Sequence, residues 1–120
     1  MLLGYRLADP YDAGDLEGLP AVVRPMVELE SLVPGSWYIN ALATLEGERG
    51  LGVGSRLLEL AHVLARASGA TRLSIIVARE NEGAARLYAR CGYAPQASRP
   101  VVPYPGLVLG GDWVLMSREV

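Results

Sequence analysis

Residues 36–68, SWYINALATLEGERGLGVGSRLLELAHVLARAS, decide the fold of this chain. The β-branched, aromatic and small residues of Ser36–Leu45 predict a strand, and because both of its faces are mostly apolar we expect a central strand covered on each side. Helical spacing of apolar residues predicts a helix over Ser55–Ser68. Between the two lies Arg49-Gly50-Leu51-Gly52-Val53-Gly54, in which every second residue is glycine. The unit is therefore a strand, a glycine-rich turn and a helix.

The segments on either side of this unit complete a mixed α/β pattern. Met1–Leu7 has the pattern of a short strand in which Gly4 permits a bulge or a close approach. Leu19–Val33 has roughly helical spacing, which Pro25 disfavours as one continuous helix. Further strands are predicted at Thr71–Ala78, Tyr93–Arg99 and Asp112–Glu119, and a further helix at Glu82–Cys91. We expect one α/β domain over residues 1–120.

The side chains of the two strong helices separate into inner and outer faces. The predicted inner stripe of the first helix consists of Leu57, Leu58, Ala61, Leu64 and Ala65. The predicted inner face of the second consists of Ala84, Leu87, Tyr88 and Cys91. Both helices are therefore expected to pack on a sheet.

The composition excludes several classes of protein. With 120 residues the chain has the length of one domain, and its formal net charge of −2 argues against nucleic-acid binding through bulk charge. All eleven basic residues are arginines, so the lysine of P-loop and Schiff-base chemistry is missing. A single histidine and a single cysteine, His62 and Cys91, predict neither a metal cluster nor a disulfide framework. Without a membrane-length apolar run or a secretory pattern at the start, we expect a cytoplasmic protein.

The glycine-rich turn predicts a binding site for a pyrophosphate. Glycines remove Cβ atoms where backbone amides could approach a ligand closely, and the helix that follows offers unpaired N–H groups and a positive dipole end. Arg49 adds a permanent charge. A Rossmann fingerprint is disfavoured, because the position of its last glycine falls on Ser55 or Leu57. An ordinary flexible turn is the alternative interpretation.

Two motifs resemble those of one family. Arg49, Gly52 and Gly54 match Arg/Gln-x-x-Gly-x-Gly/Ala, the acetyl-CoA motif of the GNAT superfamily of N-acetyltransferases. The segment Asn81-x-x-Ala84-x-x-Leu87-Tyr88-x-x-x-Gly92-Tyr93 is similar to that family's Asn-x-x-Ala-x-x-Leu-Tyr-x-x-x-Gly-Phe/Tyr. The resemblance covers Trp37–Ala94 well. It implies a mixed, mostly antiparallel sheet with helices on both faces.

The resemblance also implies that acetyl-CoA is the co-substrate and that no metal ion is needed. It further implies which residues hold acetyl-CoA. The residues assigned to the pyrophosphate are Arg49, Gly50, Gly52, Gly54 and Ser55. The main chain of Leu42 and Thr44 would pair with the pantetheine arm, and Asn81 takes a position that contacts the CoA arm. Tyr88 takes the position of the general acid that protonates the leaving thiolate.

The implied reaction is direct attack of a neutral amine on the thioester within a ternary complex. A backbone N–H of the motif strand would polarise the carbonyl, and a phenol with a pKa of about 10 is protonated at pH 7 and can donate to a thiolate. The sequence does not decide whether Glu46, Glu48 or a chain of waters is the general base that takes the proton of the amine. Tyr88 could instead be a core aromatic, and Cys91 is interpreted as a packed side chain.

The family's domain normally begins with a strand, one or two helices and a further strand, which help to form the acceptor pocket and lie before the segment that matches Met1–Leu7. No segment of this sequence matches those leading elements. A misplaced gene start, a fragmentary chain or completion by a partner chain would each account for the difference. The sheet edge left open exposes unpaired N–H and C=O groups, so we expect a homo-oligomer, specifically a dimer. The rival function is a non-catalytic acyl-CoA-binding or interaction module.

Overall fold

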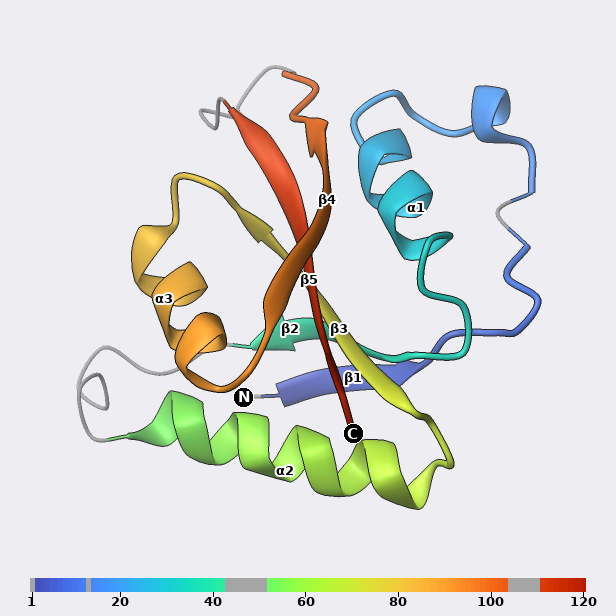
Figure 1. Cartoon of the computed structure of the whole chain (residues 1–120). Coiled ribbons are helices and arrows are strands. Elements are labelled where there is room, and N and C mark those ends of the chain that lie inside the picture. Colours follow the sequence, from blue (N-terminus) through green and yellow to red (C-terminus); the bar gives the residue numbers. More distant parts are fainter. Residues whose placement is uncertain (1, 13, 43–51, 104–110) are drawn as a thin grey trace.

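The structure, a computed structural model, describes residues 2–12, 14–42, 52–103 and 111–120. In chain order the elements are β1 (Leu2–Arg6), the 3-10 turn η1 (Leu16–Gly18), α1 (Arg24–Glu30), β2 (Trp37–Leu42), α2 (Val53–Ala67), β3 (Arg72–Ala78), α3 (Glu82–Arg90), β4 (Ala94–Pro100) and β5 (Asp112–Glu119) (Figure 1). Apart from η1, this is the order of elements that the sequence predicts.

The described strands form one sheet in the order β1-β2-β3-β5-β4. Neighbouring strands are antiparallel except for β2 and β3, which run parallel. Parallel neighbours need a crossover connection, and α2 lies in the connection between these two strands. The predicted mixed and mostly antiparallel sheet is confirmed, with β2 in its interior and with β1 and β4 at its edges.

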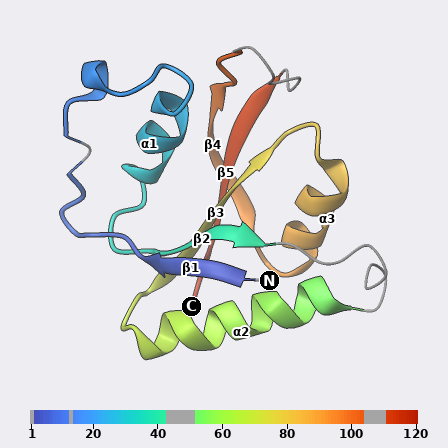
Figure 2. The ribbon, with the colours of Figure 1, turned by 180° about the vertical axis from the view of Figure 1, so that it is seen from behind.

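Helices cover both faces of the sheet, as expected (Figures 1 and 2). On one face α2 and α3 enclose a core cluster that includes Ile39, Leu73 and Tyr88. On the other face α1 packs over a second cluster that includes Leu29 and Tyr38. Side chains of a strand alternate between faces, so consecutive residues of β2 reach different clusters. Among the described residues, no helix has both the length and the apolar character to cross a bilayer.

Two details of the helices differ from the prediction. Pro25 lies in the first turn of α1, where its missing N–H has no intrahelical partner to lose, so it starts a short helix instead of interrupting a long one. Leu64 of α2 is 40% exposed, whereas Leu58, Ala61 and Ala65 are buried. Consecutive helical residues point about 100° apart, so Leu64 lies beside the contact stripe and not within it.

Gly4 lies where β1 comes unusually close to β2. The register shifts between Leu3 and Gly4, which marks a bulge. A Cβ atom on Gly4 would overlap the ring of Trp37 and lie 2.9 Å from the carbonyl oxygen of Tyr38. Both the bulge and the close approach that the sequence suggested are therefore present.

Gly4→Ala is expected to lower the free energy of unfolding by about 1–3 kcal/mol, because the added methyl group must displace a buried indole ring or a strand. Urea titration would measure the change. Gly83→Ala in α3 is the matched control, since no heavy atom of a described residue lies within 4 Å of the added Cβ. The control should be neutral or stabilising by up to about 1 kcal/mol. Equal stability of the two variants would contradict the close approach.

Candidate functional site

The parallel strands β2 and β3 separate part of the way along their length. They pair only at Trp37 with Leu73, Tyr38 with Ser74 and Ile39 with Ile75. Both strands continue beyond this ladder and diverge (Figures 1 and 2). A cleft of about 670 Å³ lies at their carboxyl ends. This volume is in the range of small-molecule sites in proteins, about 300–1,000 Å³.

The lining of the cleft is mostly apolar, with four polar side chains. Its apolar lining consists of Ile39, Ile75, Ile76, Val77, Ala78 and Trp113. Its polar lining consists of Asn40, Glu80, Asn81 and Tyr88. Because side chains alternate along β3, the lining draws on both faces of the sheet. The cleft is therefore a gap within the sheet and not a groove on one of its faces.

Helix α3 places Tyr88 and Asn81 at this cleft. Asn81 is the N-cap residue, and its Oδ1 atom accepts a hydrogen bond from the backbone N–H of Ala84 at 3.3 Å. The cap leaves the Nδ2 donors of Asn81 for another partner. Tyr88 lies on the inner face and is buried, as predicted, with Leu87 and Cys91 partly buried beside it. Capping and ligand contact are thus compatible at Asn81.

Burial raises the pKa of the Tyr88 phenol above its ordinary value. The neighbouring Tyr93, whose ring centroid is 6.2 Å from that of Tyr88, has its pKa raised to about 12, mainly by burial. Burial disfavours a charged phenolate, so both side chains stay protonated at neutral pH. A protonated phenol is the form that can donate a proton.

Stability is expected to fall in alkaline solution. A phenol whose pKa is higher in the folded than in the unfolded chain stabilises the fold fully below pH 10, and this contribution is lost as the pH rises towards the folded pKa. For Tyr93, one pKa unit corresponds to about 1.4 kcal/mol, so roughly that amount is lost by pH 11. Urea titrations at pH 8 and pH 11 would measure it. Tyr93→Phe should show a smaller loss; an identical loss would contradict the assignment.

At the amino end of α2, no side chain of the N-cap residue caps the backbone N–H groups of the first turn. Gly52 is the N-cap residue and has a left-handed φ of +76°, which favours glycine. The carbonyl oxygen of Gly52 accepts a hydrogen bond from the backbone N–H of Arg56. Among the described residues, no heavy atom lies within 4 Å of a Cβ atom placed on Gly52. Helix N-termini of this kind bind anions.

Gly54 has a packing role that the sequence reasoning did not identify. A Cβ atom on Gly54 would lie 2.9 Å from the Cδ2 atom of Leu87. The first turn of α2 therefore contacts α3 directly, one residue before Tyr88. Ser55, on the other side, lines a separate groove of about 560 Å³ that also includes His62, Arg90 and Arg118.

The structure brings some of the predicted site residues together. Asn81 and Tyr88 share the cleft, and Gly52, Gly54 and Ser55 begin α2. Leu42 is the last residue of β2 and pairs with Leu2 of β1. Five residues lie outside the described ranges: Thr44, Arg49, Gly50 and the candidate bases Glu46 and Glu48. Within those ranges, no three His, Cys, Asp or Glu side chains gather as metal ligands would.

Of the residues that line the cleft, only Asn81 and Tyr88 were assigned to the site from the sequence. Glu80 and Trp113 are among those that were not. Glu80 immediately precedes the motif residue Asn81, and this adjacency was the available signal. Trp113 carries no such signal. It reaches the cleft because β5 pairs with β3 in a register that sets it opposite Ala78.

Comparison with known proteins gives the same fold. The family model described as Acetyltransferase (GNAT) family matches residues 19–93. No curated protein sequence matches the chain. Among solved structures, a GNAT family acetyltransferase from Elizabethkingia anophelis, with acetyl-CoA bound, aligns with a TM-score of 0.66 at 22% identity, covering 71% of this chain and 61% of that one.

Two further structures resemble the chain. A nourseothricin acetyltransferase aligns with a TM-score of 0.62 at 28% identity, over 70% of this chain and 49% of its own. Another acetyltransferase aligns over 99% of this chain and 62% of its own, with a TM-score of 0.63 at 26% identity. The chain therefore spans about half to three-fifths of the length of these solved relatives. Because the family model covers more than half of its residues, the chain belongs to the acetyltransferase (GNAT) family.

Proposed function

We propose that this chain binds acetyl-CoA in the cleft between β2 and β3 and transfers the acetyl group to an amine. One observation carries the proposal: the two parallel strands part after Ile39 and Ile75, and Tyr88 lines the gap that opens. Membership of the acetyltransferase family supports the chemistry. The elongated arm of coenzyme A suits a gap of this kind.

The pantetheine arm is proposed to pair with β2. The residues of β2 after Ile39 have no partner on β3, so main-chain donors and acceptors of Asn40–Leu42 on that side can bond a ligand. An extended amide-containing chain can bind there as an added strand would. This agrees with the main-chain role that the family resemblance implies for Leu42.

The pyrophosphate is proposed to bind at the start of α2. Gly52 is the N-cap residue of this helix and provides no side-chain cap, and no described residue lies within 4 Å of a Cβ atom placed on it. Contact between Gly54 and Leu87 holds the first turn of α2 next to α3, which carries Tyr88. A ligand that crosses this junction would therefore place its two ends at the helix terminus and in the cleft.

In the proposed reaction the amine, having lost a proton, forms a bond to the thioester carbonyl carbon. The carbon–sulfur bond then breaks, and the thiolate takes the proton of the Tyr88 phenol. The nitrogen releases its second proton, which restores the phenol through solvent. Burial keeps the pKa of Tyr88 above its ordinary value, so the phenol holds its proton until the thiolate forms.

We also propose that copies of the chain associate through β1. This strand is an edge of the described sheet, and its side chains Leu3 and Tyr5 are 51% and 50% exposed. Edge strands offer unpaired backbone groups to another strand. Sedimentation at micromolar concentration tests this, and a stable monomer would contradict it.

The alternative function is an acyl-CoA-binding module without catalysis, which would use the same cleft. Calorimetry with coenzyme A and release of thiol from acetyl-CoA in the presence of amines separate the two. Binding with turnover supports the enzyme, and binding without turnover on any amine supports the module. The absence of binding overturns both.

Two matched glycine variants make the binding test specific. Gly52 and Gly69 have φ angles of +76° and +80° and lie at opposite ends of α2. Alanine at either position introduces similar backbone strain of about 1–2 kcal/mol. Only Gly52→Ala is expected to weaken coenzyme A binding. Equal affinities in the two variants would remove the pyrophosphate site from the start of α2.

A further inference from the structure

The charge of the cleft lining is confined to one carboxylate. Among the described residues that line it, Glu80 is the only one that is charged at neutral pH. The nearest arginine in sequence, Arg79, is turned to another partner: its guanidinium lies 3.3 Å from the carboxylate of Asp112. The described part of the lining therefore carries a negative charge.

The fold fixes the turn that carries Glu80. The backbone N–H of Arg79 donates to the carbonyl of Asp112 at 2.9 Å, which extends the pairing of β3 with β5 into the turn. A Cβ atom on Gly111 would lie 3.5 Å from Oε1 of Glu80, so the carboxylate lies against the start of β5. Within the described ranges, no hydrogen bond or ion pair occupies this carboxylate.

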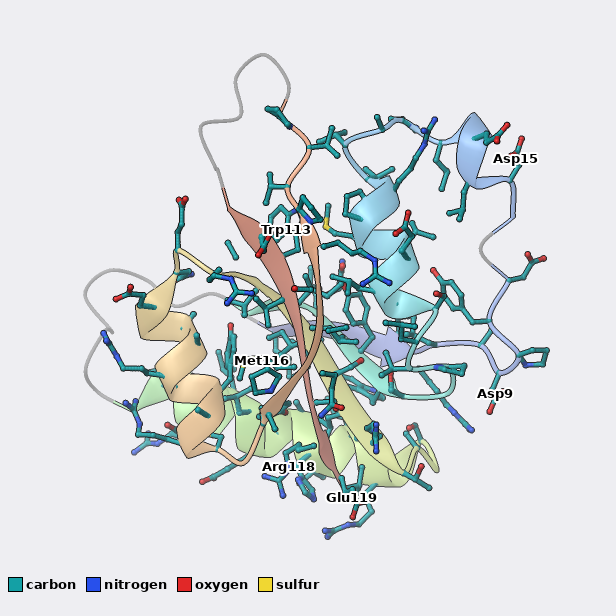
Figure 3. The ribbon with its side chains drawn as sticks, turned by 45° about the horizontal axis from the view of Figure 1, so that its top comes forward. Asp9, Asp15, Trp113, Met116, Arg118 and Glu119 are labelled. Carbon is teal, nitrogen blue, oxygen red and sulfur yellow. The ribbon has the colours of Figure 1, made fainter. Side chains whose placement is uncertain are left out.

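Trp113 lies at the same opening. It is the second residue of β5 and pairs with Ala78, two positions before Glu80. Figure 3 shows Trp113 near the start of β5, far from Arg118 and Glu119 at the other end. Its side chain is partly buried and packs against the cluster under α1. A carboxylate and an indole ring thus flank one opening, an arrangement that attracts a cation with an apolar body.

We propose that Glu80 and Trp113 select the acceptor: an amine that carries no acidic group, bound through its ammonium to Glu80 and through its apolar part to Trp113. This inference rests on the proposed function. A free amino acid would bring its own carboxylate towards Glu80, and like charges repel. Glu80 acts here as a specificity-determining residue; the ammonium loses its proton to solvent before it attacks.

Leucinol and leucine provide a matched pair of probes, because they share a side chain and an amine and differ in the carboxylate. We expect leucinol, and not leucine, to shift the indole N–H signal of Trp113 in NMR titrations, with Trp113→Phe identifying the signal. In thiol-release assays with acetyl-CoA, kcat/KM for leucinol should exceed that for leucine by about tenfold, equivalent to about 1.4 kcal/mol.

Glu80→Gln should reduce this preference to near unity. Glu82→Gln is the control, because Glu82 is an exposed carboxylate on α3 that lies 4.0 Å from Arg86 and does not line the cleft. It should keep the preference of the parent protein. An unchanged preference in Glu80→Gln, or equal signal shifts with leucine and leucinol, overturns the inference. So does the absence of any shift with leucinol.

The two readouts separate this inference from the proposed function. A shift with leucinol alone, without thiol release on any amine, supports the selective site and contradicts the acetyltransferase proposal. Thiol release with leucine and leucinol at equal kcat/KM supports the acetyltransferase and overturns the selectivity.

Discussion

Tyr88→Phe is expected to lower kcat for acetyl transfer by about 100- to 10,000-fold, the usual contribution of a general acid. The variant lacks only the hydroxyl group, so the departing thiolate has no proton donor at that position. Tyr88 is 6% exposed and lines the cleft, and burial holds its pKa above the ordinary value. A donor with these properties remains protonated across the pH range in which the enzyme would work.

Coenzyme A affinity should change little in Tyr88→Phe, because the ring and its packing remain. The matched control is Tyr93→Phe, which removes a hydroxyl from a ring 6.2 Å away that is also buried but does not line the cleft. Steady-state kinetics together with calorimetry measure both quantities. If Tyr88→Phe turns over as fast as the parent protein, Tyr88 is a core aromatic and the acid must be sought elsewhere.

Leu73→Ala is expected to lower the free energy of unfolding by about 2–5 kcal/mol, the range for a buried leucine cut back to alanine. Leu73 is 0% exposed, and its strand pairs on both sides, opposite Trp37 of β2 and Arg118 of β5. Because paired strands on both sides hold it in place, the site can collapse only slightly around the cavity. A loss of this size is a large part of the 5–15 kcal/mol that stabilises a typical domain.

Urea titration of Leu73→Ala should be compared with Val63→Ala. Val63 lies on α2 and is 60% exposed, so its truncation should change stability by less than about 0.5 kcal/mol. Equal losses in the two variants would mean that Leu73 does not lie in the core.

Local sequence pattern was enough to predict most of the elements. The two apolar faces of β2 indicated an interior strand, and its neighbours β1 and β3 confirm this. Asn81 directly precedes the predicted helix Glu82–Cys91, and its side chain caps that helix by accepting a hydrogen bond from the backbone N–H of Ala84. Such features depend on residues within one or two turns of each other. Pro25 shows the limit, because a proline can interrupt a helix or start one, and the surrounding pattern did not decide which.

The cleft itself depends on contacts that local pattern does not encode. The parallel ladder between β2 and β3 ends at Ile39 and Ile75, and no residue near either position indicates this. Trp113 lines the same cleft as Glu80 through the register of β3 with β5, across more than thirty positions of sequence. The catalytic role of Tyr88 and all the ligand roles that the resemblance implies stay predictions.

The two edges of the sheet differ in their capacity to accept another strand. Pro95 and Pro100 lie in β4, and a proline has no N–H to donate. β1 spans Leu2–Arg6 and holds no proline. If two copies pair β1 against β1 around a twofold axis, the β1 edge of each sheet is occupied. The β4 edge, with its two prolines, pairs poorly with a further strand. Such an assembly is self-limiting: it closes as a pair and does not extend into a fibre.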